Sequence, residues 1–111
     1  MVTPKRLIEG SQLTTGALTY YTALSKITTR ITKLTVTNTT ATARTVTIYL
    51  VPNLMAAGDS STITSVKTIG PNQSVDITEA EGHVLMTGDF IQALASAASA
   101  ITLMASGLEL A

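Results

Sequence analysis

The sequence contains no cysteine, no tryptophan and only one histidine among its 111 residues. Without cysteine there is no disulfide and no thiolate chemistry. With His83 alone, a single chain cannot supply two imidazole ligands to a metal ion. Apolar runs are also short, and none approaches the roughly 20 residues that a membrane-spanning helix needs. These absences argue against thiol enzymes, against histidine-rich metal centres and against a membrane protein.

Charge is scarce as well. Only 13% of the residues are charged, 45% are hydrophobic, and the formal net charge is zero. Soluble domains usually carry about 25% charged residues. Either threonine, serine and asparagine solvate the surface instead, or other subunits cover much of it. Near-zero net charge also weakens the repulsion that keeps proteins apart, so the second explanation predicts a homo-oligomer or a larger assembly.

Apolar residues and threonine alternate through residues 27–52. A period of two places the apolar side chains on one face of a strand and threonine on the other. We predict one β-hairpin here, with residues 38–44 as its loop. The apolar phase slips between Ile31 and Leu34, which predicts a β-bulge near Thr32–Lys33.

The rest of the chain reads as further short strands separated by turn residues. No segment predicts a convincing helix, and residues 79–88 form either one helical turn or an irregular crossover. The last two strands are predicted to form a second hairpin around residues 96–99. The expected fold is a single all-β, antiparallel β-sandwich of about eight short strands over residues 17–111, preceded by an extended arm or edge strand at residues 1–16. The further expected strands are 17–24, 62–69, 74–78, 89–95 and 100–105, with 108–110 continuing the pairing.

One group of ionisable residues could form a metal-binding or acid–base site. Glu79, Glu81 and His83 stand at alternate positions, and in a strand they would project from one face as a metal or acid–base group. Gly82 interrupts them, which favours a solvated polar crossover. Serine and threonine lack any base other than His83, and the glycines are too scattered for a phosphate loop. Balanced charge and the lack of tryptophan speak against nucleic-acid binding. We therefore expect no enzyme, no cofactor and no metal.

Several segments together carry a resemblance to a known family. The chain resembles the small virion structural proteins of tailed bacteriophages, and it is similar to the capsid decoration or stapling proteins of epsilon15-like short-tailed phages. The resembling segments cover most of the chain: LTT at 13–15 with YYT at 20–22, LTVTNTT at 34–40, VTIYLVP at 46–52, GDFIQALA at 88–95 and ITLMASG at 101–107.

The resemblance implies a jelly-roll-like sandwich, made in the host cytoplasm, that sits on the outer capsid surface of the virion. It also implies a non-enzymatic role, with the major capsid protein as the partner that it clamps. Two alternatives stay open: a tail-fibre or receptor-binding module that recognises carbohydrate, and a subunit of a head–tail connector.

Three regions are candidate partner contacts. The arm at residues 1–16 can reach a neighbour, even by adding a strand to its sheet. In the loop at residues 53–61, two apolar side chains are either tucked under the sandwich, as we expect, or offered to a partner. In the tyrosine pair at 20–21, one ring faces the core and the other faces out, where tyrosine favours interfaces. The candidate contact residues are Pro4, Arg6, Leu7, Ile8, Tyr21, Leu54 and Met55.

Overall fold

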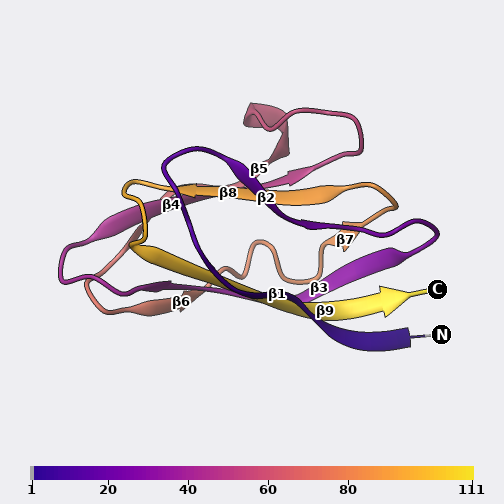
Figure 1. Cartoon of the computed structure of the whole chain (residues 1–111), viewed down its shortest axis with the longest axis horizontal. Coiled ribbons are helices and arrows are strands. Elements are labelled where there is room, and N and C mark those ends of the chain that lie inside the picture. The colour runs from indigo at the N-terminus through magenta and orange to yellow at the C-terminus, as the bar shows by residue number, and fades with distance from the viewer. Residues whose placement is uncertain (1) are drawn as a thin grey trace.

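The computed structural model describes residues 2–111, which form nine strands and one short 3-10 helix. Two antiparallel sheets face each other (Figure 1). One sheet has the strand order β1-β9-β3-β6, with β7 also paired to β3, and the other has the order β2-β8-β4-β5. The predicted all-β sandwich is confirmed. The elements are β1 (Val2–Gln12), β2 (Leu18–Thr22), β3 (Thr28–Asn38), β4 (Arg44–Val51), η1 (Asp59–Ser61), β5 (Thr62–Ile69), β6 (Ser74–Asp76), β7 (Val84–Leu85), β8 (Phe90–Ala95) and β9 (Ile101–Leu110).

The pairing follows from one reversal of the chain, at the loop between β4 and β5. Moving outward from that loop, β4 pairs with β5, β3 with β6 and β7, β2 with β8, and β1 with β9. Because β6 and β7 both pair with β3, they act as one interrupted strand. Folding such a doubled ribbon into two layers gives the jelly roll, as expected.

Both predicted hairpins are wrong. β3 and β4 lie in different sheets, and so do β8 and β9. Alternation reveals which side of a strand is buried, but every strand of a sandwich buries one side, so the pattern cannot name the pairing partner. At the first connection the buried Asn38 amide builds an arch instead of a hairpin turn. Its Nδ2 donates to the carbonyls of Thr42 (2.8 Å) and Ile69 (3.1 Å), and its Oδ1 accepts the Thr40 N–H (2.9 Å).

The structure confirms some of the local predictions and corrects others. The bulge in β3 is confirmed, since the register with β9 shifts between Ile31 and Lys33. β5 spans the whole predicted segment, whereas β6 ends at Asp76, two residues early. The segment 79–88 is a crossover of turns that also contains the unpredicted two-residue strand β7.

The core lies between the two sheets and is filled by branched aliphatic side chains from both. Because the paired strands come from all parts of the sequence, most contacts in the protein are between residues that are distant in the chain. The side chains with no exposed surface include Leu13, Ile31, Leu34, Val36, Val46, Ile48, Ile69, Ile77, Ile91, Ile101 and Leu103.

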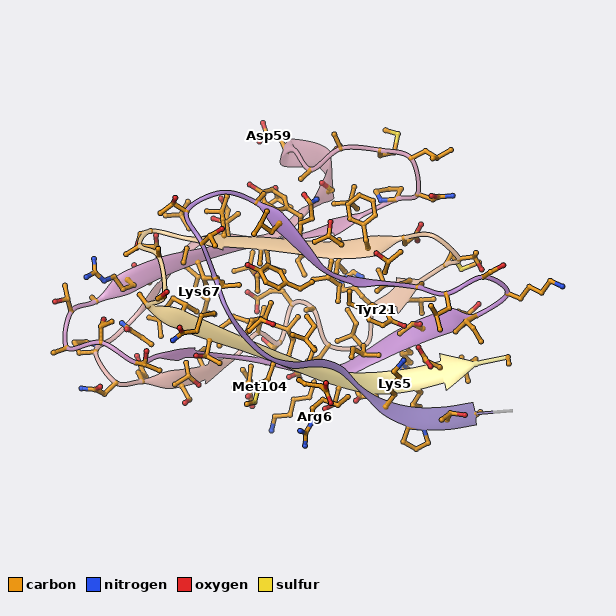
Figure 2. All side chains as sticks on the ribbon, viewed as in Figure 1. Lys5, Arg6, Tyr21, Asp59, Lys67 and Met104 are labelled. Carbon is orange, nitrogen blue, oxygen red and sulfur yellow. The ribbon has the colours of Figure 1, made fainter. Side chains whose placement is uncertain are left out.

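A hydrogen-bonded group of polar side chains also joins the two sheets. The Tyr21 hydroxyl of β2 donates to Glu109 Oε2 of β9 (2.7 Å) and accepts from the Thr29 hydroxyl of β3 (2.8 Å). Lys5 Nζ lies 3.5 Å from the same Glu109 oxygen. Figure 2 places Tyr21 between the sheets, close to Lys5. Burial raises the pKa of Tyr21 to about 12; the hydrogen bond with Thr29 opposes this rise, while the hydrogen bond to Glu109 and its negative charge add to it.

Replacing Tyr21 with phenylalanine should lower the free energy of unfolding by about 1–3 kcal/mol at neutral pH, because Thr29 and Glu109 lose their partner inside the sandwich. The wild type should also lose stability as pH rises from about 10 to about 12. In that window the unfolded chain releases the Tyr21 proton while the folded chain retains it. Urea unfolding of the wild type and of Tyr21→Phe at pH 8 and pH 11.5 measures these free energies. If the free energy of unfolding fell equally in both proteins between the two pH values, the raised pKa of Tyr21 would be contradicted.

Candidate functional site

The acid–imidazole pattern does not assemble into a site. Glu79 accepts hydrogen bonds from the hydroxyls of Thr78 (2.9 Å) and Thr64 (3.4 Å) and lies 3.8 Å from Lys67 Nζ. The Thr78 hydrogen bond is the main cause that lowers the Glu79 pKa. These contacts fix Glu79 beside β5. Across residues 2–111, no group of three or more histidine, cysteine or acidic side chains could hold a metal ion, and no helix has the length and apolar character to cross a bilayer.

Charge is divided unequally between the two sheets. The strands of the four-stranded sheet carry only Arg44 and Lys67, whereas those of the five-stranded sheet carry Lys5, Arg6, Glu9, Arg30, Lys33, Asp76 and Glu109. In the middle of the four-stranded sheet, Tyr49 lies opposite Gln92, and Thr47 lies opposite Leu94. Tyr49, Gln92 and Leu94 are partly exposed on the outer face, whereas Thr47 is buried and its hydroxyl accepts the Val66 N–H. This uncharged face has the composition of an interface centre, where charged residues are depleted.

The edges of both sheets are poor templates for another strand. β1 is paired with β9 from Val2 to Gln12, contains Pro4, and shifts register twice. β2 is short and bulged, and β6 has only three residues. On β5 the exposed Val66 has a φ of 46°, which a β-branched residue rarely adopts. Such features discourage strand addition, so contact through faces and loops is favoured over contact through the arm.

Three loops meet at one end of the sandwich, and Asp89 holds them together. Asp89 Oδ1 accepts the Asn53 N–H of the β4–β5 loop (2.9 Å), and Oδ2 accepts the Met86 N–H of the β7–β8 loop (2.9 Å). Its backbone carbonyl accepts the Ala23 N–H of the β2–β3 loop (2.9 Å). A single aspartate thus fixes the relative positions of all three loops.

These loops, with the adjoining β7, expose large apolar side chains, a group that we call the apolar loop end: Leu24, Leu54, Met55, Val84 and Met86. Leu54 is 93% exposed and Met55 62% exposed, so the expectation that they tuck under the sandwich is wrong. The loop makes a tight turn from Pro52 to Met55, with Leu54 at a φ of 66°, and projects away from the four-stranded sheet (Figure 1). Val51, the last residue of β4 before this loop, is by contrast fully buried.

The structure separates the seven predicted contact residues into two groups. Pro4, Arg6, Leu54 and Met55 are exposed, whereas Leu7, Ile8 and Tyr21 are buried and hold the sandwich together. The register shift between Arg6 and Ile8 turns two consecutive side chains inward, which a simple alternation does not anticipate. Sequence reasoning missed Leu24, Val84 and Met86. The signal was present in Met86, a large apolar residue in a turn that continues with glycine and aspartate.

No protein-family model, curated protein or solved structure matches this chain. Three surfaces of the protein could contact a partner. These are the apolar loop end, the uncharged outer face of the four-stranded sheet and the charged outer face of the five-stranded sheet.

Proposed function

We propose that the protein is a non-enzymatic capsid decoration protein that binds the outer lattice of a phage capsid and stabilises contacts between major capsid proteins. The observation that carries the proposal is the presence of three chemically different surfaces on one small sandwich. The two outer faces point in opposite directions, and the apolar loop end lies at a third side. A decoration protein that links capsid proteins, which we call a clip, must contact at least two neighbouring capsid proteins at once. A module that binds a single ligand needs only one surface.

The energetics of a clip suit these surfaces. Burying one exposed leucine or methionine side chain contributes about 1.5–3 kcal/mol, whereas association itself costs about 4–15 kcal/mol, so the apolar loop end alone supports only a weak contact. Many copies bind one shell, and the stabilising free energies of their weak contacts between capsid proteins add up over the whole lattice. No single contact needs to be tight.

A second candidate function is a glycan-binding module of the tail. Tyr49 lies opposite Gln92 on the uncharged face, so a phenol ring stands beside a side-chain amide. An aromatic ring with a neutral hydrogen-bonding group next to it suits a sugar, which presents both a C–H face and hydroxyls. This candidate needs only the uncharged face and leaves the apolar loop end without a role.

The deciding experiment adds the purified protein to shells assembled from the major capsid protein encoded in the same genome. Bound copies per shell are counted by quantitative gel, and the heat resistance of the shells is measured. We expect saturation at hundreds of copies and a higher disruption temperature. Absence of binding would overturn the proposal, and a glycan array would then test the tail module.

Leu54→Asn separates folding from binding. Asparagine tolerates a left-handed backbone better than leucine, so we expect the free energy of unfolding to stay level or rise by up to about 1 kcal/mol. Affinity for shells should fall about tenfold or more, because an apolar contact is lost. The matched control is Val66→Asn, which also replaces an exposed apolar residue at positive φ but lies on β5, away from the apolar loop end. Shell binding by Leu54→Asn as tight as that of the wild type would show that the apolar loop end is not a contact.

A further inference from the structure

We infer that the outer face of the five-stranded sheet docks an acidic protein segment, with a carboxylate held between Arg6 and Lys33. The inference rests on the proposed function for the identity of the partner, the major capsid protein. The chemistry of the partner follows from the geometry of the face itself.

The register of three strands brings the two cations together. Arg6 of β1 lies opposite Ser106 of β9, and Ser106 lies opposite Lys33 of β3. Neighbouring strands are about 4.8 Å apart, so the two cationic residues are separated by roughly 10 Å across the Ser106 hydroxyl. Their long side chains can close on one carboxylate from either side. We call these three residues the cationic row.

The surface is hollowed on both sides of the cationic row. A depression of about 310 Å³ is lined by Arg6, Lys33, Thr35, Met104, Ala105 and Ser106. A second, of about 380 Å³, runs beside Pro4, Thr32 and Leu108 and shares Arg6 and Ser106 with the first. Met104 is 49% exposed and offers an apolar contact next to the charges. Figure 2 shows Arg6 and Met104 on the same side of the molecule, on the outer side of the five-stranded sheet.

None of the acids on these strands forms an ion pair with Arg6. Asp76 accepts from the Thr35 hydroxyl (2.9 Å) and lies 3.5 Å from Lys33, in an exposed pair that leaves Lys33 able to bind elsewhere. Glu109 lies on the inner side of the sheet, where it binds Tyr21 and Lys5, so it does not belong to this face. Glu9, the remaining acid of these strands, lines neither depression.

Arg6 makes no ion pair with any residue among 2–111. A free guanidinium matches a carboxylate in shape and charge, and it binds one through two parallel hydrogen bonds. The positive charge on this face is local, since the chain as a whole is neutral. Nucleic acid needs cations that follow a run of phosphates, and here an apolar Met104 adjoins a single row. An acidic side chain beside an apolar one on a protein surface fits better.

The first test uses charge reversal on shells. Arg6→Glu and Lys33→Glu should each weaken shell binding at least tenfold at 50 mM NaCl, and the wild type should weaken as NaCl rises to 300 mM. The control Lys67→Glu makes the same charge change on the edge strand β5. Lys67 lies opposite the core-facing Val46 and beside Glu79, off both outer faces, so this variant should bind as the wild type does. Thermal unfolding of each variant checks that the fold is retained. Unchanged binding by both reversed variants overturns the inference while leaving the proposed function in place.

The second test does not depend on shells. Hexaglutamate is titrated into the isotope-labelled protein and followed by amide chemical shifts, with duplex DNA of matched charge as the comparison. We expect the peptide to shift the amides of Arg6, Lys33 and Ser106, and Arg6→Glu to abolish those shifts. Shifts centred elsewhere, or tighter binding of DNA than of peptide, would overturn the inference. Peptide binding to this face without any shell binding would support the inference and reject the proposed function.

Discussion

Replacing Gly107 with alanine should destabilise the protein by about 3 kcal/mol, and replacing it with valine should prevent stable folding. Gly107 of β9 is paired with Ile31 of β3 on one side and with Lys5 of β1 on the other. An added Cβ would press against the backbone carbonyl of Arg30 and come within 2.9 Å of Leu7 Cδ1. The carbonyl belongs to a paired strand in the middle of the sheet, so it cannot move aside without breaking the ladder.

Urea unfolding of Gly107→Ala beside the wild type measures this cost. Gly16→Ala is the matched control, because a Cβ at position 16 meets nothing within 4 Å. The control should change the free energy of unfolding by no more than about 0.5 kcal/mol. If Gly107→Ala were as stable as the control, the close approach of β9 to β3 would be wrong, and with it the position of the cationic row.

Asp89→Ala should have the second large effect, acting on the apolar loop end. The substitution removes the carboxylate hydrogen bond that ties Asn53 of the β4–β5 loop to the β7–β8 loop, and also the one to the Met86 N–H that holds the β7–β8 loop itself. We expect a loss of about 1–3 kcal/mol in the free energy of unfolding, since hydrogen bonds to a charged group are lost at a partly exposed site. The free energy of shell binding should decrease by more than the free energy of unfolding does, because loops that are no longer fixed must be ordered again on binding.

Amide hydrogen exchange gives a direct readout of this change. The amides of Asn53 and Met86 should exchange much faster in Asp89→Ala, whereas the Leu103 amide in the middle of β9 should be little affected under native conditions. Asp89→Asn is the conservative comparison. It keeps one acceptor oxygen but points an amide N–H at the other donor, so its effect should be intermediate. Unchanged exchange at Asn53 in the alanine variant would show that Asp89 does not order the loop.

The alternation of apolar and threonine residues was enough to predict strands, the bulge at Thr32–Lys33 and a two-layer sandwich. These features are local: they depend on which side of each strand is buried, and a period of two reports that directly. The near absence of charge in β2, β4, β5 and β8 was also present in the sequence. Its meaning, one uncharged outer face, appeared only when those four strands were seen to form one sheet.

The tertiary structure alone decided the strand partners and the candidate surfaces. In a jelly roll the chain pairs from its reversal outward, so β1 meets β9 from the far end of the sequence, and no local pattern encodes that partner. The same non-local pairing places Arg6, Ser106 and Lys33 in one row and forces glycine at position 107. It also buries Leu7 and Ile8, which the sequence offered as contacts. The sequence determined what each strand buries, and the fold determined which strands, and therefore which exposed side chains, stand together.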